Sequence, residues 1–186
     1  IATFGTSAIA ANAVANSLCS IAVIPGSALG LAMITVVGQC VGAGDHQQTR
    51  HYAGVLMKLS YLAMFITNLL TTVLAGPLVG FYNLSGTTPV TAQHLAMIHS
   101  GMAIIFWPAS FTLPNALRAA GDAKFTMVVS MLSMWIFRIG FSFLLGQALN
   151  MGVEGVWWAM IIDWVAQVTC FVLRFKGTRW QEKRLI

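Results

Sequence analysis

The sequence predicts an all-α fold: a polytopic bundle of transmembrane helices with five spans. Of its 186 residues, 58% are hydrophobic and only 8% are charged, whereas soluble domains carry about 25% charged residues. Five long apolar segments follow one another, each with the roughly 20 apolar residues that a spanning helix needs. A water-soluble fold could not cover its surface with so few charges, so we expect these segments to cross a bilayer.

The first segment covers residues 6–42 and is too long for one upright span. Pro25 and Gly26 lie in its middle, which predicts either a kinked helix or two half-helices that meet at this break. Two pairs of glycines have the four-residue spacing that lets neighbouring helices approach closely. These pairs are Gly26 with Gly30 and Gly38 with Gly42.

Four further spans complete the predicted bundle. They are expected at residues 48–82, 90–120, 125–149 and 153–175. Pro108 and Pro114 lie inside the third segment, so we expect a second bent helix there. The connections are short, which makes successive helices antiparallel neighbours.

The basic residues indicate how the bundle is oriented. All of them except Arg138 lie near the turn after the first segment, the turn after the third, or the C-terminus. They are Arg50 and Lys58, Arg118 and Lys124, and Arg174, Lys176, Arg179, Lys183 and Arg184. Five alternating spans place these three regions on one side, which the positive-inside rule makes cytoplasmic. We therefore expect a multi-pass protein of the cell membrane with a cytoplasmic C-terminus. A nucleic-acid partner is not expected, because no basic stripe with interleaved aromatic residues is present.

Several other classes of function lack support in the sequence. There is no phosphate-binding loop, HExxH, CxxC or nucleophile elbow, so neither an enzyme nor a bound cofactor is predicted. Cys19, Cys40 and Cys170 are scattered through apolar runs without metal-ligand spacing, so no metal site is expected. The chain begins with Ile1 and no leader pattern, and we interpret its N-terminus as truncated.

Two charges inside the apolar segments are the sharpest local feature. Arg138 lies 149 − 138 = 11 residues before Leu149, and Asp163 lies 163 − 153 = 10 residues after Val153. At 1.5 Å per residue both lie about 15–17 Å from the outer edge, near the midplane. Three arrangements are open: a structural ion pair, a cation or proton site on Asp163 with Arg138 as its switching partner, or separate charges that face a water-filled cavity.

Other polar and aromatic residues are candidates for a substrate or ion pathway. The amides are Asn12, Asn16, Asn68, Asn115 and Gln167, which either line a cavity or bond across helices. Trp107, Trp135 and Trp164 either stack on aromatic cations or serve packing and interface roles. His94 and His99, near the outer end of the third segment, are expected to anchor that end at the interface.

Several runs resemble the multidrug and toxic compound extrusion (MATE) exporters. Residues 36–45 (Val-Val-Gly-Gln-Cys-Val-Gly-Ala-Gly-Asp) are similar to the stretch that closes the eighth helix of that family. Residues 115–122 (Asn-Ala-Leu-Arg-Ala-Ala-Gly-Asp) resemble the stretch after the tenth helix. Residues 135–139 and 152–157 resemble parts of the eleventh helix and the entry to the twelfth.

The resemblance implies a fold of twelve helices in two six-helix lobes. Residues 1–186 would be the C-terminal lobe, without the N-terminal lobe and most of the preceding helix. The implied activity is secondary active efflux of cationic or amphipathic compounds by antiport with Na⁺ or H⁺, with one lobe rocking against the other. The implied partners are a small cationic substrate, membrane lipid and the missing lobe.

One position departs from the family pattern. Some members have a Na⁺-binding Asp about ten residues before the Leu-Arg pair, and Trp107 stands there in this chain. The family's cation ligands therefore cannot be carried over, and the coupling ion stays open. The alternatives are a lipid-linked saccharide flippase of the same superfamily and a membrane scaffold subunit that does not transport.

Overall fold

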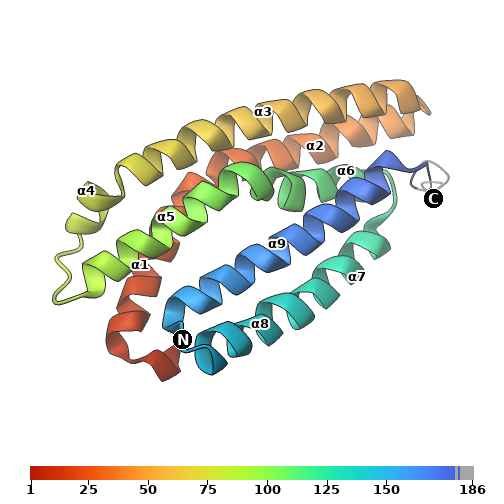
Figure 1. Cartoon of the computed structure of the whole chain (residues 1–186). Coiled ribbons are helices and arrows are strands. Elements are labelled where there is room, and N and C mark those ends of the chain that lie inside the picture. Colours follow the sequence, from red (N-terminus) through yellow and green to blue (C-terminus); the bar gives the residue numbers. More distant parts are fainter. Residues whose placement is uncertain (179, 181–186) are drawn as a thin grey trace.

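The protein is an elongated bundle of helices (Figure 1). A computed structural model describes residues 1–178 and 180. Within this part, five helical stretches are long and apolar enough to cross a membrane. They are Ile24–Gly42, His46–Val73, Thr88–Ala119, Ala123–Ala148 and Gly152–Lys176. The predicted all-α bundle with five spans is confirmed.

The first long segment bends near its middle. It consists of the short turn η1 (Ala2–Phe4), α1 (Thr6–Ala22) and α2 (Ile24–Gly42). Pro25 stands in the first turn of α2, where its missing N–H costs no hydrogen bond. Val23 separates the two helices, and its backbone N–H still donates to Cys19 O at 3.2 Å. The break is therefore a bend between two helices and not a loop.

The second segment begins with a capped helix. It comprises α3 (His46–Val73) and the short α4 (Ala75–Gly80). Asp45 accepts a hydrogen bond from the backbone N–H of Gln48 at 2.8 Å, which satisfies one of the free donors at the start of α3. Gly44, at φ +73°, makes the turn that precedes this cap.

The third segment is bent at its prolines, as predicted. It consists of α5 (Thr88–Trp107), the π-helical segment η2 (Pro108–Thr112) and α6 (Leu113–Ala119). Pro108 has no N–H to donate to the preceding turn. The N–H of Leu113 donates to Pro108 O, five residues back, which widens the helix at this point.

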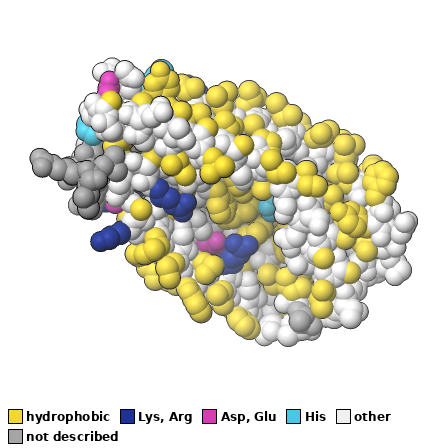
Figure 2. Space-filling view, turned by 180° about the vertical axis from the view of Figure 1, so that it is seen from behind, with side chains coloured by type: hydrophobic (Ala, Val, Ile, Leu, Met, Phe, Trp, Pro, Cys, Tyr) yellow, Lys and Arg dark blue, Asp and Glu magenta, His cyan; other side chains and the backbone are white. Residues whose placement is uncertain are grey.

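The fourth segment departs from a regular helix. It comprises α7 (Ala123–Ser133), η3 (Met134–Gly140), α8 (Phe141–Phe143) and η4 (Leu144–Ala148), where η3 and η4 are π-helical. It lies along α9 (Gly152–Lys176), and most of its surface is exposed. Only 6% of the residues in its most apolar stretch are buried, compared with 56% for the third segment. Hydrophobic side chains cover much of the molecular surface (Figure 2), as expected for a protein surrounded by lipid.

Only one of the two glycine pairs in α2 makes a close approach. A Cβ added at Gly26 would lie 2.4 Å from the Trp107 ring, and one at Gly30 would lie 2.7 Å from Nδ2 of Asn115. Gly38 and Gly42 have no neighbouring atom within 4 Å of such a Cβ. The spacing therefore identified one true contact between α2 and the third segment, whereas the other pair makes no such close approach to any described residue.

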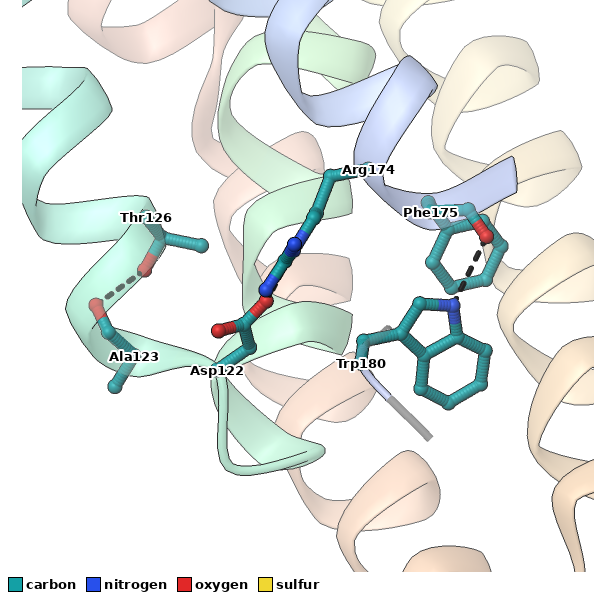
Figure 3. Close-up of polar contacts among 6 residues, drawn as sticks. All are labelled: Asp122, Ala123, Thr126, Arg174, Phe175 and Trp180. Carbon is teal, nitrogen blue, oxygen red and sulfur yellow. Dashed lines mark hydrogen bonds and ion pairs between the residues drawn. The ribbon is translucent and has the colours of Figure 1, made fainter. Parts of the chain in front are cut away.

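Three basic regions of the chain meet at one end of the bundle. Nε of Arg174 lies 2.6 Å from Oδ2 of the buried Asp122 (Figure 3). The guanidinium of Arg174 also lies over the ring of Phe125. Arg50 donates to Gly177 O at 3.2 Å, which joins the start of α3 to the end of α9. The turns after the first and third segments therefore lie beside the end of α9, as predicted. Arg179, Lys183 and Arg184 lie outside the described residues.

Candidate functional site

Asp163 lies deep in the bundle and is almost completely hidden from solvent. It projects from α9 and is 1% exposed. Its Oδ1 accepts a hydrogen bond from Oγ of Ser133 and another, at 3.0 Å, from Nε2 of Gln167. Gln167 is one helical turn further along α9, and Ser133 is the last residue of α7. Both bonds fall on Oδ1, so among the described residues Oδ2 has no hydrogen-bond donor.

Arg138 shares a cavity with Asp163 but does not pair with it. It lies in η3, and together with Asp163 and Gln167 it lines a cavity of about 260 Å³. Across residues 1–178 and 180, no ion pair joins the two side chains. The structure therefore does not contain the structural ion pair that the sequence allowed. Neutral donors hold the carboxylate instead, and the two charges lie apart on the cavity wall.

Aromatic rings form the wall of an adjoining cavity of about 180 Å³. Phe111 and Arg138 line both cavities. The ring of Phe111 lies 5.1 Å from that of Trp107 and 6.0 Å, edge to face, from that of Trp164. Figure 2 shows a hollow on this face, where basic, acidic and histidine side chains meet hydrophobic ones. We call the two cavities together the recess.

The position of His99 differs from the prediction. It lies 99 − 88 = 11 residues into α5, about 16 Å along the helix. His99 is therefore buried inside the bundle and does not present its ring at the surface of the helix end. Its ring is 7% exposed, 5.2 Å from Trp164 and 5.8 Å from Trp157. His94 alone of the two stands near the outer end, 3.5 Å from Glu154.

The π-helical segment η2 positions the aromatic wall. Ser110 donates from Oγ to Trp164 O at 3.1 Å, which fixes η2 against α9. Thr112 donates to Gly26 O at 3.4 Å, which fixes it against α2 on the other side. These two bonds hold Phe111, which lies between them in sequence, at the boundary between the two cavities.

The remaining predicted site residues divide into two groups. Asn16 and Trp107 line the smaller cavity. Asn12, Asn68 and Asn115 serve helix packing: Asn12 accepts from Trp157 Nε1 at 3.0 Å, Asn68 donates to Met64 O, and Asn115 donates to Gly30 O. Five of the eight predicted residues therefore meet at the recess: Asp163, Arg138, Gln167, Asn16 and Trp107.

Sequence reasoning missed Ser133 and Phe111. Ser133 looks like an ordinary hydroxyl residue in an apolar helix, although it is a donor to Asp163. The sequence offered one indication of its role: Ser133 lies five residues from Arg138 on the fourth segment, and therefore also near the midplane of the membrane. Phe111 follows Pro108 by three residues and lies in the π-helical segment η2, which the sequence did not predict.

A family model described as MatE matches residues 1–144 of the chain. The chain belongs to the MatE family. The family resemblance inferred from the sequence is thereby confirmed. The uncharacterized transporter YisQ of Bacillus subtilis is 29% identical over 98% of this chain and 40% of its own length. A probable multidrug resistance protein NorM of Neisseria meningitidis serogroup B is 29% identical over 93% of this chain and 38% of its own.

A solved structure shows the same fold. The eukaryotic MATE transporter AtDTX14 superimposes with a TM-score of 0.82 at 22% identity, over 95% of this MatE chain and 39% of its own. The chain spans about 40% of the length of the curated relatives it matches. The apolar helices and the family together show a multi-pass membrane protein.

In this MatE chain, Gly26→Ala is expected to lower the free energy of unfolding by about 1–3 kcal/mol. The new Cβ would lie 2.4 Å from the rigid ring of Trp107 and 2.7 Å from Sδ of Met64, so the ring must move. The melting temperature in detergent measures the effect. Gly38→Ala is the matched control, because it adds the same methyl group to the same helix where no atom lies within 4 Å. Equal melting temperatures for the two variants would contradict the prediction.

Proposed function

We propose that this chain is the C-terminal lobe of a secondary exporter that removes cationic or amphipathic compounds in exchange for Na⁺ or H⁺. Two relatives described as probable multidrug resistance proteins support this proposal, as does the chain's coverage of only part of their length. The other lobe would complete the cavity wall. Transport would follow from the rocking of one lobe against the other around a site near the midplane.

The proposal rests on the buried carboxylate of Asp163. A carboxylate in the middle of apolar helices is costly and is therefore retained where it has a task. Its Oδ1 is held by Ser133 and Gln167, which fixes the group in place. Its Oδ2 stays free to take a proton or to coordinate Na⁺, which prefers oxygen ligands.

Arg138 would act as the switching partner of this site. A guanidinium on the same cavity wall repels a cation at Asp163, and the repulsion grows as the two groups approach. A movement of η3 relative to α9 would therefore change the affinity for the coupling ion. Asn16 and Trp107 extend the wall and would contact the substrate.

The basic end of the bundle would face the cytoplasm in the plasma membrane. The turns around Arg50 and Lys124 lie beside the end of α9, so the described basic groups share one end. The positive-inside rule assigns such an end to the cytoplasmic side.

Asp163→Asn is expected to reduce gradient-driven efflux of a cationic dye at least about tenfold, the effect of losing about 1.4 kcal/mol of ion binding. The change keeps the size of the side chain and one oxygen that can accept from Ser133 and Gln167, but it replaces the other oxygen with an amide donor and removes the charge. Dye efflux by the full-length protein in vesicles, under separately imposed Na⁺ and H⁺ gradients, measures it.

Glu154→Gln provides the control for this experiment. Glu154 is the other acid of α9, and it lies at the exposed end beside His94. Unchanged efflux in Asp163→Asn would remove Asp163 from the coupling mechanism. If the wild-type protein moves no dye under either gradient, the scaffold alternative replaces the exporter.

A further inference from the structure

A groove lies between the start of α7 and the end of α9. Its volume is about 490 Å³, and the described residues that line it differ from those of the recess. They are Phe125, Cys170, Leu173, Arg174, Gly177 and Thr178. We call this cavity the end groove. It is a candidate binding site separate from the recess.

The end groove lies at the depth of the lipid headgroups. α9 has 25 residues and is therefore about 37 Å long, which exceeds a hydrocarbon core of about 30 Å. Arg174 lies 176 − 174 = 2 residues before the end of α9, and Phe125 lies 125 − 123 = 2 residues after the start of α7. The groove is therefore placed where the two helices leave the hydrocarbon, beside the phosphate groups of the lipids.

One part of the end groove is basic. Arg174 lines it, and Asp122 holds Arg174 in place, with Oδ2 of Asp122 2.6 Å from Nε of Arg174 (Figure 3). Lys124 and Lys176 are exposed, and each is next in sequence to a lining residue. Three cations against one carboxylate give a local net charge of 3 − 1 = +2. This charge attracts an anion, and the planar guanidinium suits a phosphate.

The other part of the end groove is apolar. Leu173 is 66% exposed, and Cys170, which is 173 − 170 = 3 residues deeper on the same face of α9, is exposed as well. The ring of Phe125 closes the groove on the side of α7. An acyl chain that lies here would remove this apolar surface from its surroundings, whereas a free phosphate ion or an acidic peptide would leave it uncovered. The combination therefore favours a lipid.

We propose that the end groove binds an anionic phospholipid, with its phosphate on Arg174, Lys124 and Lys176 and an acyl chain along Leu173 and Cys170. Basic pockets between helices at the cytoplasmic side of membrane proteins bind anionic headgroups in this way. A zwitterionic lipid offers the same chains, but its own cation offsets the charge of the phosphate. The bound lipid would join α7 to α9 at the basic end, whether or not the recess transports.

Two lipids with identical oleoyl chains test the proposal: phosphatidylglycerol, which is anionic, and phosphatidylcholine, which is zwitterionic. Native mass spectrometry of the full-length protein in a neutral detergent counts the bound lipids and gives their dissociation constants. One phosphatidylglycerol is expected to bind about 25-fold more tightly than phosphatidylcholine. The reason is the net charge of the groove, because each cation at a membrane surface contributes about a factor of five.

Variants assign this preference to the end groove. Lys124→Gln and Lys176→Gln are each expected to weaken phosphatidylglycerol binding about fivefold, and together about 25-fold, to the level of phosphatidylcholine. Both lysines are exposed, so the variants are expected to fold. Lys58→Gln is the matched control: it removes the same charge from α3, which does not line the groove, and should change neither affinity. Leu173→Ser should weaken both lipids alike.

The proposal is overturned if the wild-type protein binds the two lipids equally, or if the double lysine variant keeps the wild-type affinity for phosphatidylglycerol. A loss in Lys58→Gln as large as that in Lys124→Gln would assign the preference to overall charge and would overturn the proposal too.

Competition at constant ionic strength identifies the occupant. Inorganic phosphate and a hexaglutamate peptide are each expected to leave the bound phosphatidylglycerol in place. If phosphate displaced the lipid, the groove would be a site for the free ion. If the peptide displaced it, the groove would be a docking site for an acidic protein segment. Either displacement would overturn the proposal.

Discussion

Arg174→Met is expected to lower the free energy of unfolding by about 3–5 kcal/mol, as the loss of one partner from a buried ion pair does. The change keeps most of the apolar stem but leaves the Asp122 carboxylate, of which only 3% is exposed, without a cation. Removal of the guanidinium also ends its contact with the Phe125 ring, 4.7 Å away. Unfolding of the full-length protein in detergent, monitored by tryptophan fluorescence, measures the loss.

Substitutions of Asp122 and of Arg174 are expected to lower the free energy of unfolding by different amounts. Asp122→Asn leaves Arg174 behind, but 17% of that side chain is exposed, so its guanidinium can reach water. The cost of Asp122→Asn should therefore be clearly smaller than that of Arg174→Met. Equal costs would show that the pair does not behave as a buried ion pair.

A matched turn provides the control. Asp45 and Asp122 each follow a glycine with positive φ and each precede a helix. Asp45 caps its helix, whereas Asp122 makes no capping bond and turns its carboxylate to Arg174. Asp45→Asn should cost almost nothing, because Asn caps a helix as well as Asp.

Gly155→Ala is expected to destabilise the contact between α9 and η4 by at least about 1–3 kcal/mol. The added Cβ would lie 2.7 Å from the carbonyl carbon of Leu145 and 2.8 Å from the backbone nitrogen of Gly146. A backbone cannot rotate away as a side chain can, so α9 and η4 must move apart where Gly155 contacts Leu145 and Gly146.

The melting temperature in detergent measures this effect too, with Gly101→Ala as the control. Gly101 lies inside α5, and no atom lies within 4 Å of a Cβ placed there. That substitution should be neutral or slightly stabilising, because Ala has the higher helix propensity. A wild-type melting temperature for Gly155→Ala would mean that α9 and η4 are less closely packed than the structure shows.

The spans of the fold were predictable from the sequence, because hydropathy and length directly report which residues cross a bilayer. The bends were predictable as well, since Pro25 and Pro108 remove backbone donors. Hydrophobic runs do not report the π-helical segments η3 and η4. Nothing in residues 134–148 distinguishes a bond to the fifth residue back from one to the fourth.

The depth of the site residues in the membrane was predictable from the sequence, but the directions in which their side chains point were not. Counting residues at 1.5 Å each places Arg138 and Asp163 at one height. It does not give the angle at which each side chain leaves its helix, and the π-helical turns of η3 change that angle from the regular 3.6-residue period. The ion pair was one of three arrangements that the sequence left open, and the described residues do not contain it: Ser133 lies next to Asp163 instead.

The exposure of the fourth segment separates two kinds of constraint on its amino acids. Trp135, Ile136 and Phe143 are each at least 55% exposed. At these positions the side chain must be hydrophobic, but its shape is not constrained by packing. Along the narrow strip that faces Gly155, shape matters because backbone meets backbone. Most of the circumference of this helix can thus accept any hydrophobic side chain, while the backbone contact of Leu145 and Gly146 with Gly155 holds the helix in place.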